Sequence, residues 1–96
     1  MIARILASNP KPESIDAAVE QWPHHIGMLK GKGLVRGYLF VDRAACKFLS
    51  ITIWESKQAQ ERNAGSPEQA KLRTEFMKHL TGAPVASVFE VAAAVD

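Results

Sequence analysis

The sequence predicts an α+β protein of ferredoxin-like topology, with a four-stranded antiparallel sheet and helices on one face. The first observation is the order of its periodic segments, which reads strand, helix, strand, strand, helix, strand. Right-handed crossovers place both helical segments on the same side of such a sheet. The second observation is that Leu34–Val41 and Phe48–Trp54 are apolar on both faces. The third is a length of 96 residues without repeats or linkers, which predicts a single domain over residues 1–96.

The first half of the chain is expected to form one strand and one helix. Ile2–Ala7 predicts a strand that ends in the proline-containing turn Ser8–Pro12. Pro23 interrupts the helix that follows, and because proline removes an amide donor we expect a kink or a split there. Gly31 and Gly33 are expected to end it. The apolar residues that recur at helical spacing are Ile15, Ala18, Val19, Trp22, Ile26 and Leu29.

The second helical segment is predicted to consist of two pieces. It begins after Ser56 and is broken near Asn63–Gly65. It restarts with Ser66 as N-cap, a proline at the first helical position and Gln69 completing a capping box. Val85–Ala93 is the expected last strand. The apolar stripe of the second piece comprises Leu72, Phe76, Met77 and Leu80, interrupted by Arg73.

The two central strands are joined by the hairpin-length segment Asp42–Ala45 and need cover on both faces. In the first strand, we expect Leu34, Tyr38 and Phe40 to share one face. In the second strand one face is purely aliphatic, and the other mixes apolar with polar residues. The aliphatic set suits a dry interface and consists of Leu49, Ile51 and Ile53. The mixed set suits a pocket beneath the helices and consists of Ser50, Thr52 and Trp54 together with Tyr38 of the first strand.

The helices cover only one face, so the other is expected to pair with a second copy of the chain. A bare face with about ten large apolar side chains exceeds what soluble monomers tolerate. At about 25 cal/mol per Å², burying roughly 1,500 Å² of such surface offers tens of kcal/mol before ordering costs. The sequence therefore predicts a homodimer through the sheet face.

Composition argues against several other classes of protein. The formal net charge is +2, and the twelve basic residues are scattered without the stripe that a nucleic-acid binder needs. The single Cys46 excludes an intrachain disulfide and a thiolate metal cluster, which favours a reducing compartment. No apolar run reaches membrane-spanning length, and the start lacks the features of a signal peptide. We expect a cytoplasmic protein without nucleic-acid or membrane partners.

The segment Ser50–Ala59 resembles the strand-to-helix junction of the antibiotic biosynthesis monooxygenase family, the dimeric α+β barrels. The resemblance extends through four further segments and covers most of the chain. It implies a cofactor-independent monooxygenase-like protein that acts on or binds a small aromatic or polyketide-like compound. The alternative is a non-catalytic small-molecule-binding or scaffold homodimer with the same fold. The four further segments are Gly37–Leu39 with Val41–Asp42, Leu72–Arg73, Pro84 and Val88–Val91.

Residue matching to the quinone-forming members of the family is partial. Trp54 and Arg73 match a tryptophan and an arginine of their pocket. An asparagine four residues before the tryptophan is replaced by Ser50, and a tyrosine six residues after it by Gln60. The resemblance therefore implies catalytic roles for Trp54, Arg73 and Ser50, which would orient the substrate and stabilise charge on oxygen. A purely packing role for Trp54 remains the alternative.

The heme-degrading members fit less well. Their second-helix tryptophan falls at Asn63 and their axial histidine at or near Arg73, while Asn9 lies near the asparagine that closes their first strand. Without that imidazole no iron ligand is evident, so we expect no cofactor. The adjacent His24 and His25 are about 100° apart on a helix, which disfavours a shared metal ion, and no metal site is expected.

The predicted pocket contains further residues from both helical segments and from the strands. His25 is either a solvated helix residue or a group at the pocket edge that exchanges protons near neutral pH. Arg73 needs a partner, which is Glu55, Glu90 or an anionic or phenolate ligand, unless it extends to solvent along an apolar edge. The ligand-pocket residues are predicted to be Trp22, His25, Tyr38, Thr52 and Met77.

Overall fold

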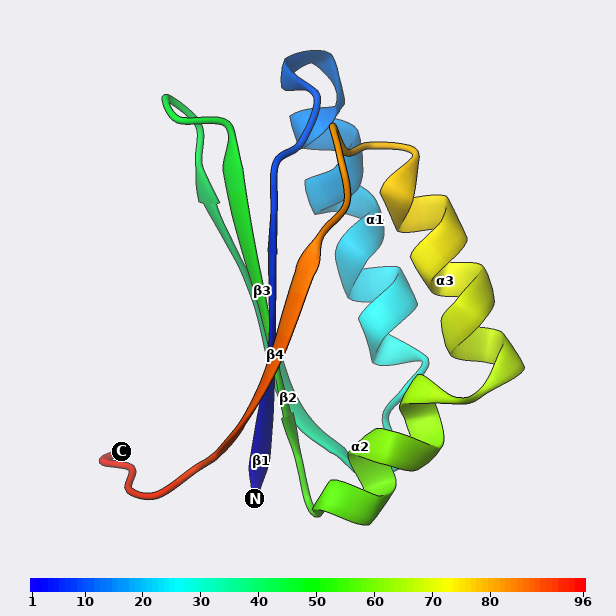
Figure 1. The fold of residues 1–96 in the computed structure, drawn as a ribbon, viewed down its shortest axis with the longest axis vertical. Helices are drawn as coiled ribbons and strands as arrows, with labels where there is room; N and C mark the ends of the chain where they lie inside the picture. Colours follow the sequence, from blue (N-terminus) through cyan, green and yellow to red (C-terminus); the bar gives the residue numbers. More distant parts are fainter.

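Four antiparallel strands form one sheet in the order β2-β3-β1-β4, and three helices cover one of its faces (Figure 1). The computed structural model describes every residue from 1 to 96. This arrangement confirms the predicted α+β, ferredoxin-like fold. The strands are β1 (Ile2–Ser8), β2 (Leu34–Asp42), β3 (Lys47–Trp54) and β4 (Val85–Glu90). The three α-helices are α1 (Ile15–Gly27), α2 (Lys57–Ala64) and α3 (Pro67–Met77). A short 3-10 helix, η1 (Pro12–Ser14), precedes α1.

The second helical segment is divided as its sequence predicts. The hydroxyl oxygen of Ser56 caps α2 by accepting from the amide of Ala59 at 3.1 Å. The hydroxyl oxygen of Ser66 caps α3 in the same way, accepting from the amide of Gln69 at 3.1 Å. Each cap satisfies an amide that the first turn of a helix leaves unpaired. The expected split at Pro23 is absent, because α1 continues through this proline, which is exposed and removes only one amide donor.

A β-bulge at the start of β2 decides which of its side chains face the helices. Leu34 pairs with Trp54, but Arg36 pairs with the next residue of β3, so one extra residue is accommodated between them. The bulge reverses the alternation, and Tyr38 pairs with Ile51 on the face away from the helices. The prediction that Leu34 and Tyr38 share a face is therefore wrong.

The last strand is shorter than expected and ends at Glu90 rather than Ala93. Glu90 pairs with Ile2, which is the first residue of β1. Only Met1 lies beyond it, and its carbonyl accepts one more bond from the amide of Val91 at 3.0 Å. β4 therefore ends at the level where β1 begins.

The core consists of two clusters that lie at opposite ends of the helix-facing side of β3. Phe48 belongs to the first cluster and Trp54 to the second, and both are almost fully buried. Ser50 and Thr52 lie between them on the same face of the strand, and both are buried. Because alternate residues of a strand share a face, the apolar core is interrupted in its middle by two hydroxyl groups.

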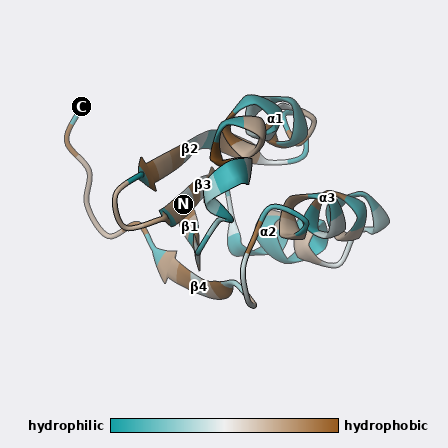
Figure 2. Cartoon of the chain, turned by 90° about the horizontal axis from the view of Figure 1, so that it is seen from above, coloured by the Kyte–Doolittle hydropathy of each residue, from teal (hydrophilic) through white to brown (hydrophobic).

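The other face of the sheet is apolar and carries no helix. Figure 2 shows the helices on one side and only the C-terminal segment on the other. Tyr38 and Phe40 stack there with ring centroids 5.7 Å apart, yet Phe40 remains 51% exposed and Phe89 55% exposed. We call this surface the outer face. Its apolar residues are Ala3, Ile5, Ala7, Tyr38, Phe40, Leu49, Ile51, Ile53, Val85 and Phe89.

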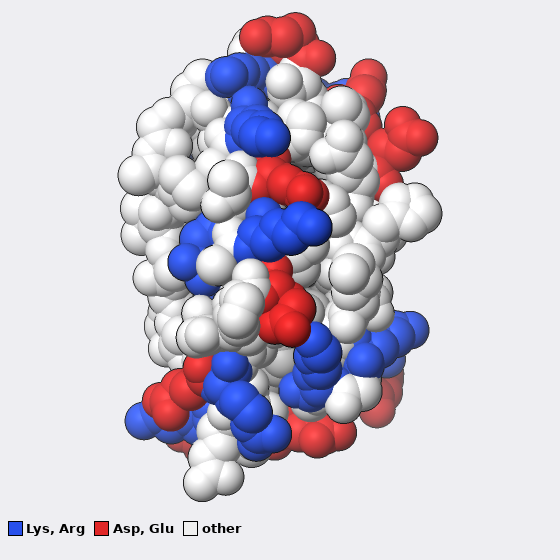
Figure 3. Space-filling view, turned by 90° about the vertical axis from the view of Figure 1, so that its right-hand side faces the viewer, with Lys and Arg blue, Asp and Glu red and all other residues white.

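Charged side chains are interspersed on the helical side of the molecule. Figure 3 shows basic and acidic residues alternating over the side on which α3 lies, without a continuous basic surface in that view. Two ion pairs lie at the surface. Arg43, in the turn between β2 and β3, pairs with Asp16 of α1 at 2.9 Å, and Lys57 pairs with Glu61 within α2 at 3.9 Å. None of the helices combines the length and the apolar character needed to cross a bilayer.

Candidate functional site

A cavity of about 310 Å³ lies between the sheet and the helices. It is lined by 17 residues, nine of them hydrophobic, which is typical of a small-molecule site with a few polar groups. Ser50 and Thr52, whose hydroxyl groups interrupt the apolar core on β3, are among its lining residues. Seven of the eight residues predicted for the site line it: Trp22, His25, Ser50, Thr52, Trp54, Arg73 and Met77.

The eighth residue, Tyr38, does not reach the cavity. It lies on the outer face, where it is 42% exposed and its phenol oxygen accepts from Arg36 Nη1 at 3.2 Å. The bulge in β2 is the physical reason, since it turns Tyr38 away from the helices. Gln60, at the position of the family's tyrosine, is buried but is not among the lining residues. Neither the phenol of Tyr38 nor the amide of Gln60 therefore contributes to this cavity.

Two indole groups donate to the two hydroxyl groups of β3. Trp22 Nε1 donates to Ser50 Oγ at 3.3 Å, and Trp54 Nε1 donates to Thr52 Oγ1 at 2.9 Å. The indole of Trp54 is thereby fixed within the core cluster, and that of Trp22 is fixed on α1 across from the sheet. Each hydroxyl still has its own hydrogen and a second lone pair for another partner. The cavity thus combines two aromatic walls with two oriented hydroxyl groups.

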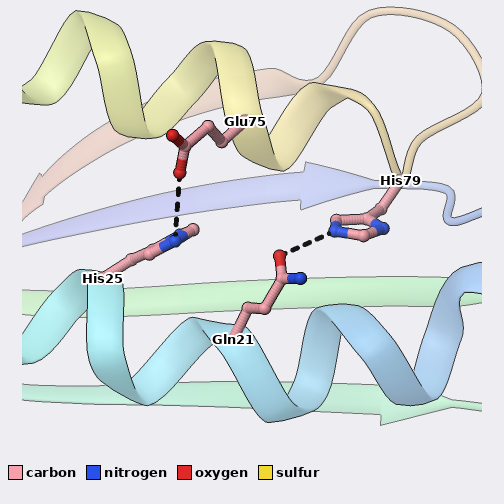
Figure 4. A network of polar contacts seen from close by, with 4 residues as sticks. All are labelled: Gln21, His25, Glu75 and His79. Carbon is pink, nitrogen blue, oxygen red and sulfur yellow. Dashed lines mark hydrogen bonds and ion pairs between the residues drawn. The ribbon is translucent and has the colours of Figure 1, made fainter.

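His25 faces α3 at the edge of the cavity. Its Nε2 atom lies 3.3 Å from Glu75 Oε2, and its side chain is only 19% exposed (Figure 4). One turn away, His79 Nε2 and Gln21 Oε1 are 2.9 Å apart, so two polar contacts link α1 with α3 and the turn after it. His25 thus lies at the edge of the cavity and not on a fully solvated helix surface. The carboxylate of Glu75 beside the imidazole fixes the orientation of the ring.

Arg73 has no carboxylate partner. Its Nη2 donates to the carbonyl oxygen of Ala64, the last residue of α2, at 3.3 Å. A cation suits this position because the final carbonyls of a helix carry partial negative charge. No ion pair joins Arg73 to Glu55 or Glu90, so of the alternatives for Arg73 the two internal carboxylates are not its partners in this structure. The guanidinium keeps most of its donors free at the cavity.

Arg4 is a second arginine at the cavity that the sequence analysis did not identify. It lies on the central strand β1, opposite Thr52 of β3 and Val88 of β4, on the helix-facing side of the sheet. Partial burial, followed by the nearby charge of Arg73, lowers the pKa of Arg4. The available signal was the alternation of Ile2, Arg4 and Leu6, which puts a charge on one face of a short apolar strand.

Asn63 provides an acceptor at the cavity. Its Nδ2 donates to Gln69 Oε1 at 3.1 Å, and both residues line the cavity. Asn63 is only 8% exposed, and its Oδ1 atom is buried without a hydrogen-bond partner. An unpaired buried acceptor is costly, so this oxygen is an unfavourable point in the packing beside the cavity. By contrast, Asn9 lies outside the cavity, where its carbonyl oxygen accepts from the amide and hydroxyl of Thr81.

Three solved structures have a fold similar to that of this chain. One is a structure titled antibiotic biosynthesis monooxygenase, with TM-score 0.78 and 18% identity over 97% of this chain and 100% of the other. The second is a monooxygenase from the gene ActVA-Orf6 of Streptomyces coelicolor in complex with nanaomycin D. Its TM-score is 0.82 at 20% identity, and the match covers 98% of this chain and 89% of the other. The third is SnoaB, a cofactor-independent oxygenase from Streptomyces nogalater, with TM-score 0.76 and 14% identity over 98% and 95%.

The chain has the fold of the antibiotic biosynthesis monooxygenases. The predicted resemblance is thereby confirmed for the fold along the whole chain. No family profile matches the sequence, and the comparison with curated proteins finds no match either. At these identities the antibiotic biosynthesis monooxygenase fold alone is established, and activity has to be argued from the site.

Gly37 lets α1 approach β2 closely at the Trp22 wall of the site. A Cβ atom at this position would lie 3.0 Å from Trp22 Cη2 and 3.2 Å from Ile26 Cγ2. We expect Gly37→Ala to displace Trp22 and destabilise the protein by about 1–3 kcal/mol, as overpacking does. Thermal unfolding measures the effect. The matched control is Gly27→Ala, where nothing lies within 4 Å of the added atom, and an equal loss in both variants would contradict this packing role.

Proposed function

We propose that this protein is a cofactor-independent monooxygenase that acts on a small hydroxylated aromatic compound of the polyketide type. The observation that carries the proposal is the pair of indoles held by Ser50 and Thr52 within the cavity beside Arg73. Flat aromatic walls suit a polycyclic ligand, and oriented donors suit oxygen atoms on its rim. The ActVA-Orf6 protein and SnoaB, which share the fold, are named as a monooxygenase and a cofactor-independent oxygenase.

The proposed reaction converts the methylene carbon of an anthrone-type phenol to a ketone. A base removes one methylene proton, and the electron-rich anion that results reacts with molecular oxygen at that carbon. The resulting hydroperoxide loses water, with the second methylene hydrogen leaving as a proton. One oxygen atom enters the product as the ketone and the other leaves as water, so the substrate is oxidised by four electrons and oxygen is reduced by four.

The side chains of the cavity divide this chemistry between them. His25 is the candidate base, and Glu75 stabilises the imidazolium that forms after proton transfer. Arg73 and the Ser50 hydroxyl donate to oxygen atoms on which negative charge develops. Trp54 and Trp22 hold the ring system so that the methylene carbon lies near His25.

We propose in addition that two copies of the chain pair through the outer face. This face is apolar across all four strands, while its charged positions lie toward the ends of β2 and β3. Exposed aromatic groups such as Phe40 and Phe89 make a contiguous apolar surface that a lone soluble protomer rarely tolerates. A second copy offers a matching surface under two-fold symmetry, because the same patch then faces itself.

Turnover of a dihydroxyanthrone with and without oxygen tests the proposed function. We expect purified protein treated with a chelator to form the anthraquinone in air faster than the heat-denatured protein does, and to form none under argon. Trp54→Phe should slow the reaction, since it removes the indole that is bonded to Thr52. Ligand binding with an intact fold but no oxygen-dependent product would contradict the proposal and leave a binding protein.

A further inference from the structure

Two arginines line the cavity, and no acidic side chain does. Its 17 lining residues include Arg4, Arg73 and His25 but no aspartate or glutamate. Glu75 contacts His25 from outside the set of lining residues. The three ion pairs of the protein include neither arginine. Positive charge therefore faces this apolar space without an internal counter-charge.

Arg4 is placed where a guanidinium is costly without a partner. It lies on β1, one of the two inner strands, between β3 and β4, and it is partly buried on the helix-facing side of the sheet. No hydrogen bond or ion pair of the protein involves its side chain. Removing a charge from water is unfavourable unless a partner replaces the lost hydration, and a second cation nearby adds repulsion. The lowered pKa of Arg4 reflects both effects.

An anion bound in the cavity would offset the cost of desolvating the Arg4 guanidinium and its repulsion by Arg73. A carboxylate accepts two parallel bonds from one guanidinium and can be shared with a second. Apolar residues next to the arginines lower the local dielectric, which strengthens such charge-assisted bonds. The remaining walls are aromatic or aliphatic, including Trp22, Trp54 and Leu72. The cavity is thus complementary to a molecule with an aromatic body and one anionic group.

We propose that the ligand of this cavity is an aromatic carboxylate whose carboxylate group is bound by Arg4, which leaves Arg73 for the reacting part of the molecule. The inference rests on the proposed function only in using the same cavity, because it specifies binding and requires no turnover. It narrows the substrate class from hydroxylated aromatic compounds in general to those with an acidic side group. Arg4 is a binding residue in this scheme, and it leaves Ser50 free for the reacting part of the molecule.

Calorimetric titration with two matched probes tests the proposal. The probes are 2-naphthoate and its neutral analogue 2-naphthamide, which differ in charge but hardly in size. We expect the carboxylate to bind at least about tenfold more tightly, as the strength of charge-assisted hydrogen bonds implies. Inorganic phosphate is the third probe and should bind weakly, because it leaves the aromatic walls uncovered. Equal affinity for naphthoate and naphthamide, no binding of either, or phosphate binding as tight as naphthoate would overturn the proposal.

Variants of Arg4 show whether this residue is responsible for the discrimination. Arg4→Met should remove the preference for naphthoate over naphthamide, whereas Arg4→Lys should keep part of it. Arg62→Met is the matched control, since Arg62 is exposed on α2 and does not line the cavity. It removes the same charge and should retain the preference. A preference that survives in Arg4→Met would contradict the assignment.

Thermal unfolding without ligand separates a binding role of Arg4 from a structural one. If Arg4 is present for a ligand, Arg4→Met should raise the melting temperature of the empty protein by a few degrees, because it relieves desolvation and repulsion. A structural arginine would show the opposite change. Failure of the anthrone reaction would leave these binding results intact, and loss of the naphthoate preference would leave oxygen-dependent turnover intact, so the two proposals fail separately.

Discussion

Replacing His25 by alanine is expected to lower kcat for the oxygen-dependent reaction by about 10²- to 10⁴-fold, the usual contribution of a general base. The physical reason is that His25 is the imidazole that lines the cavity and is oriented by Glu75 at 3.3 Å. Steady-state oxygen consumption with a dihydroxyanthrone measures the loss. Free imidazole in the buffer should restore part of the rate, because the vacated space admits a replacement base.

The neighbouring histidine provides the matched control for this prediction. His24 is adjacent in sequence but is exposed and does not line the cavity. We expect His24→Ala to retain the turnover of the unmodified protein. Similar losses in the His24 and His25 variants, or full activity in His25→Ala, would show that the base lies elsewhere.

The second large effect is expected on the outer face. Ile51 lies at its centre, opposite Ile5 of β1 and Tyr38 of β2. Ile51→Lys would bury an unpaired charge in the proposed dimer interface, which costs about 3–5 kcal/mol per buried charge. Two-fold symmetry doubles the effect, so we expect the variant to sediment as a monomer at concentrations where the unmodified protein is a dimer.

Ala17→Lys is the control for the outer-face variant. Ala17 is exposed on α1, on the opposite side of the molecule from the outer face. The substitution adds the same charge and should leave the dimer intact. If the unmodified protein already sediments as a compact monomer at micromolar concentration, the pairing of the two outer faces is wrong.

The fold was predictable because its signals are local and repeat along the chain. The apolar stripe of α1 and the serine caps of α2 and α3 each occupy a few neighbouring residues, and the structure contains each of them. Element order then restricted the topology to a small set. The end of β4 was not predictable in this way, because it depends on where β1 begins to pair with it.

The candidate site was only partly predictable, for reasons that involve residues distant in sequence. The resemblance pointed to Trp54 and Arg73, and the mixed face of β3 pointed to Ser50 and Thr52. Tyr38 was assigned to the wrong face, because a single bulged residue in β2 is invisible to a period-two pattern. Arg4 was missed because alternation within β1 shows that two faces differ but not which one the helices cover.

Mass spectrometry of the product formed under heavy-isotope oxygen gas tests the central claim most directly. The claim is that the cavity uses molecular oxygen, without a cofactor, to convert the methylene carbon of its aromatic substrate to a ketone. In a single turnover of a dihydroxyanthrone with chelator-treated protein, we predict one heavy oxygen atom in the quinone and one in water. A quinone whose new oxygen comes from solvent, or labelling at the same rate with the heat-denatured protein, would contradict the account.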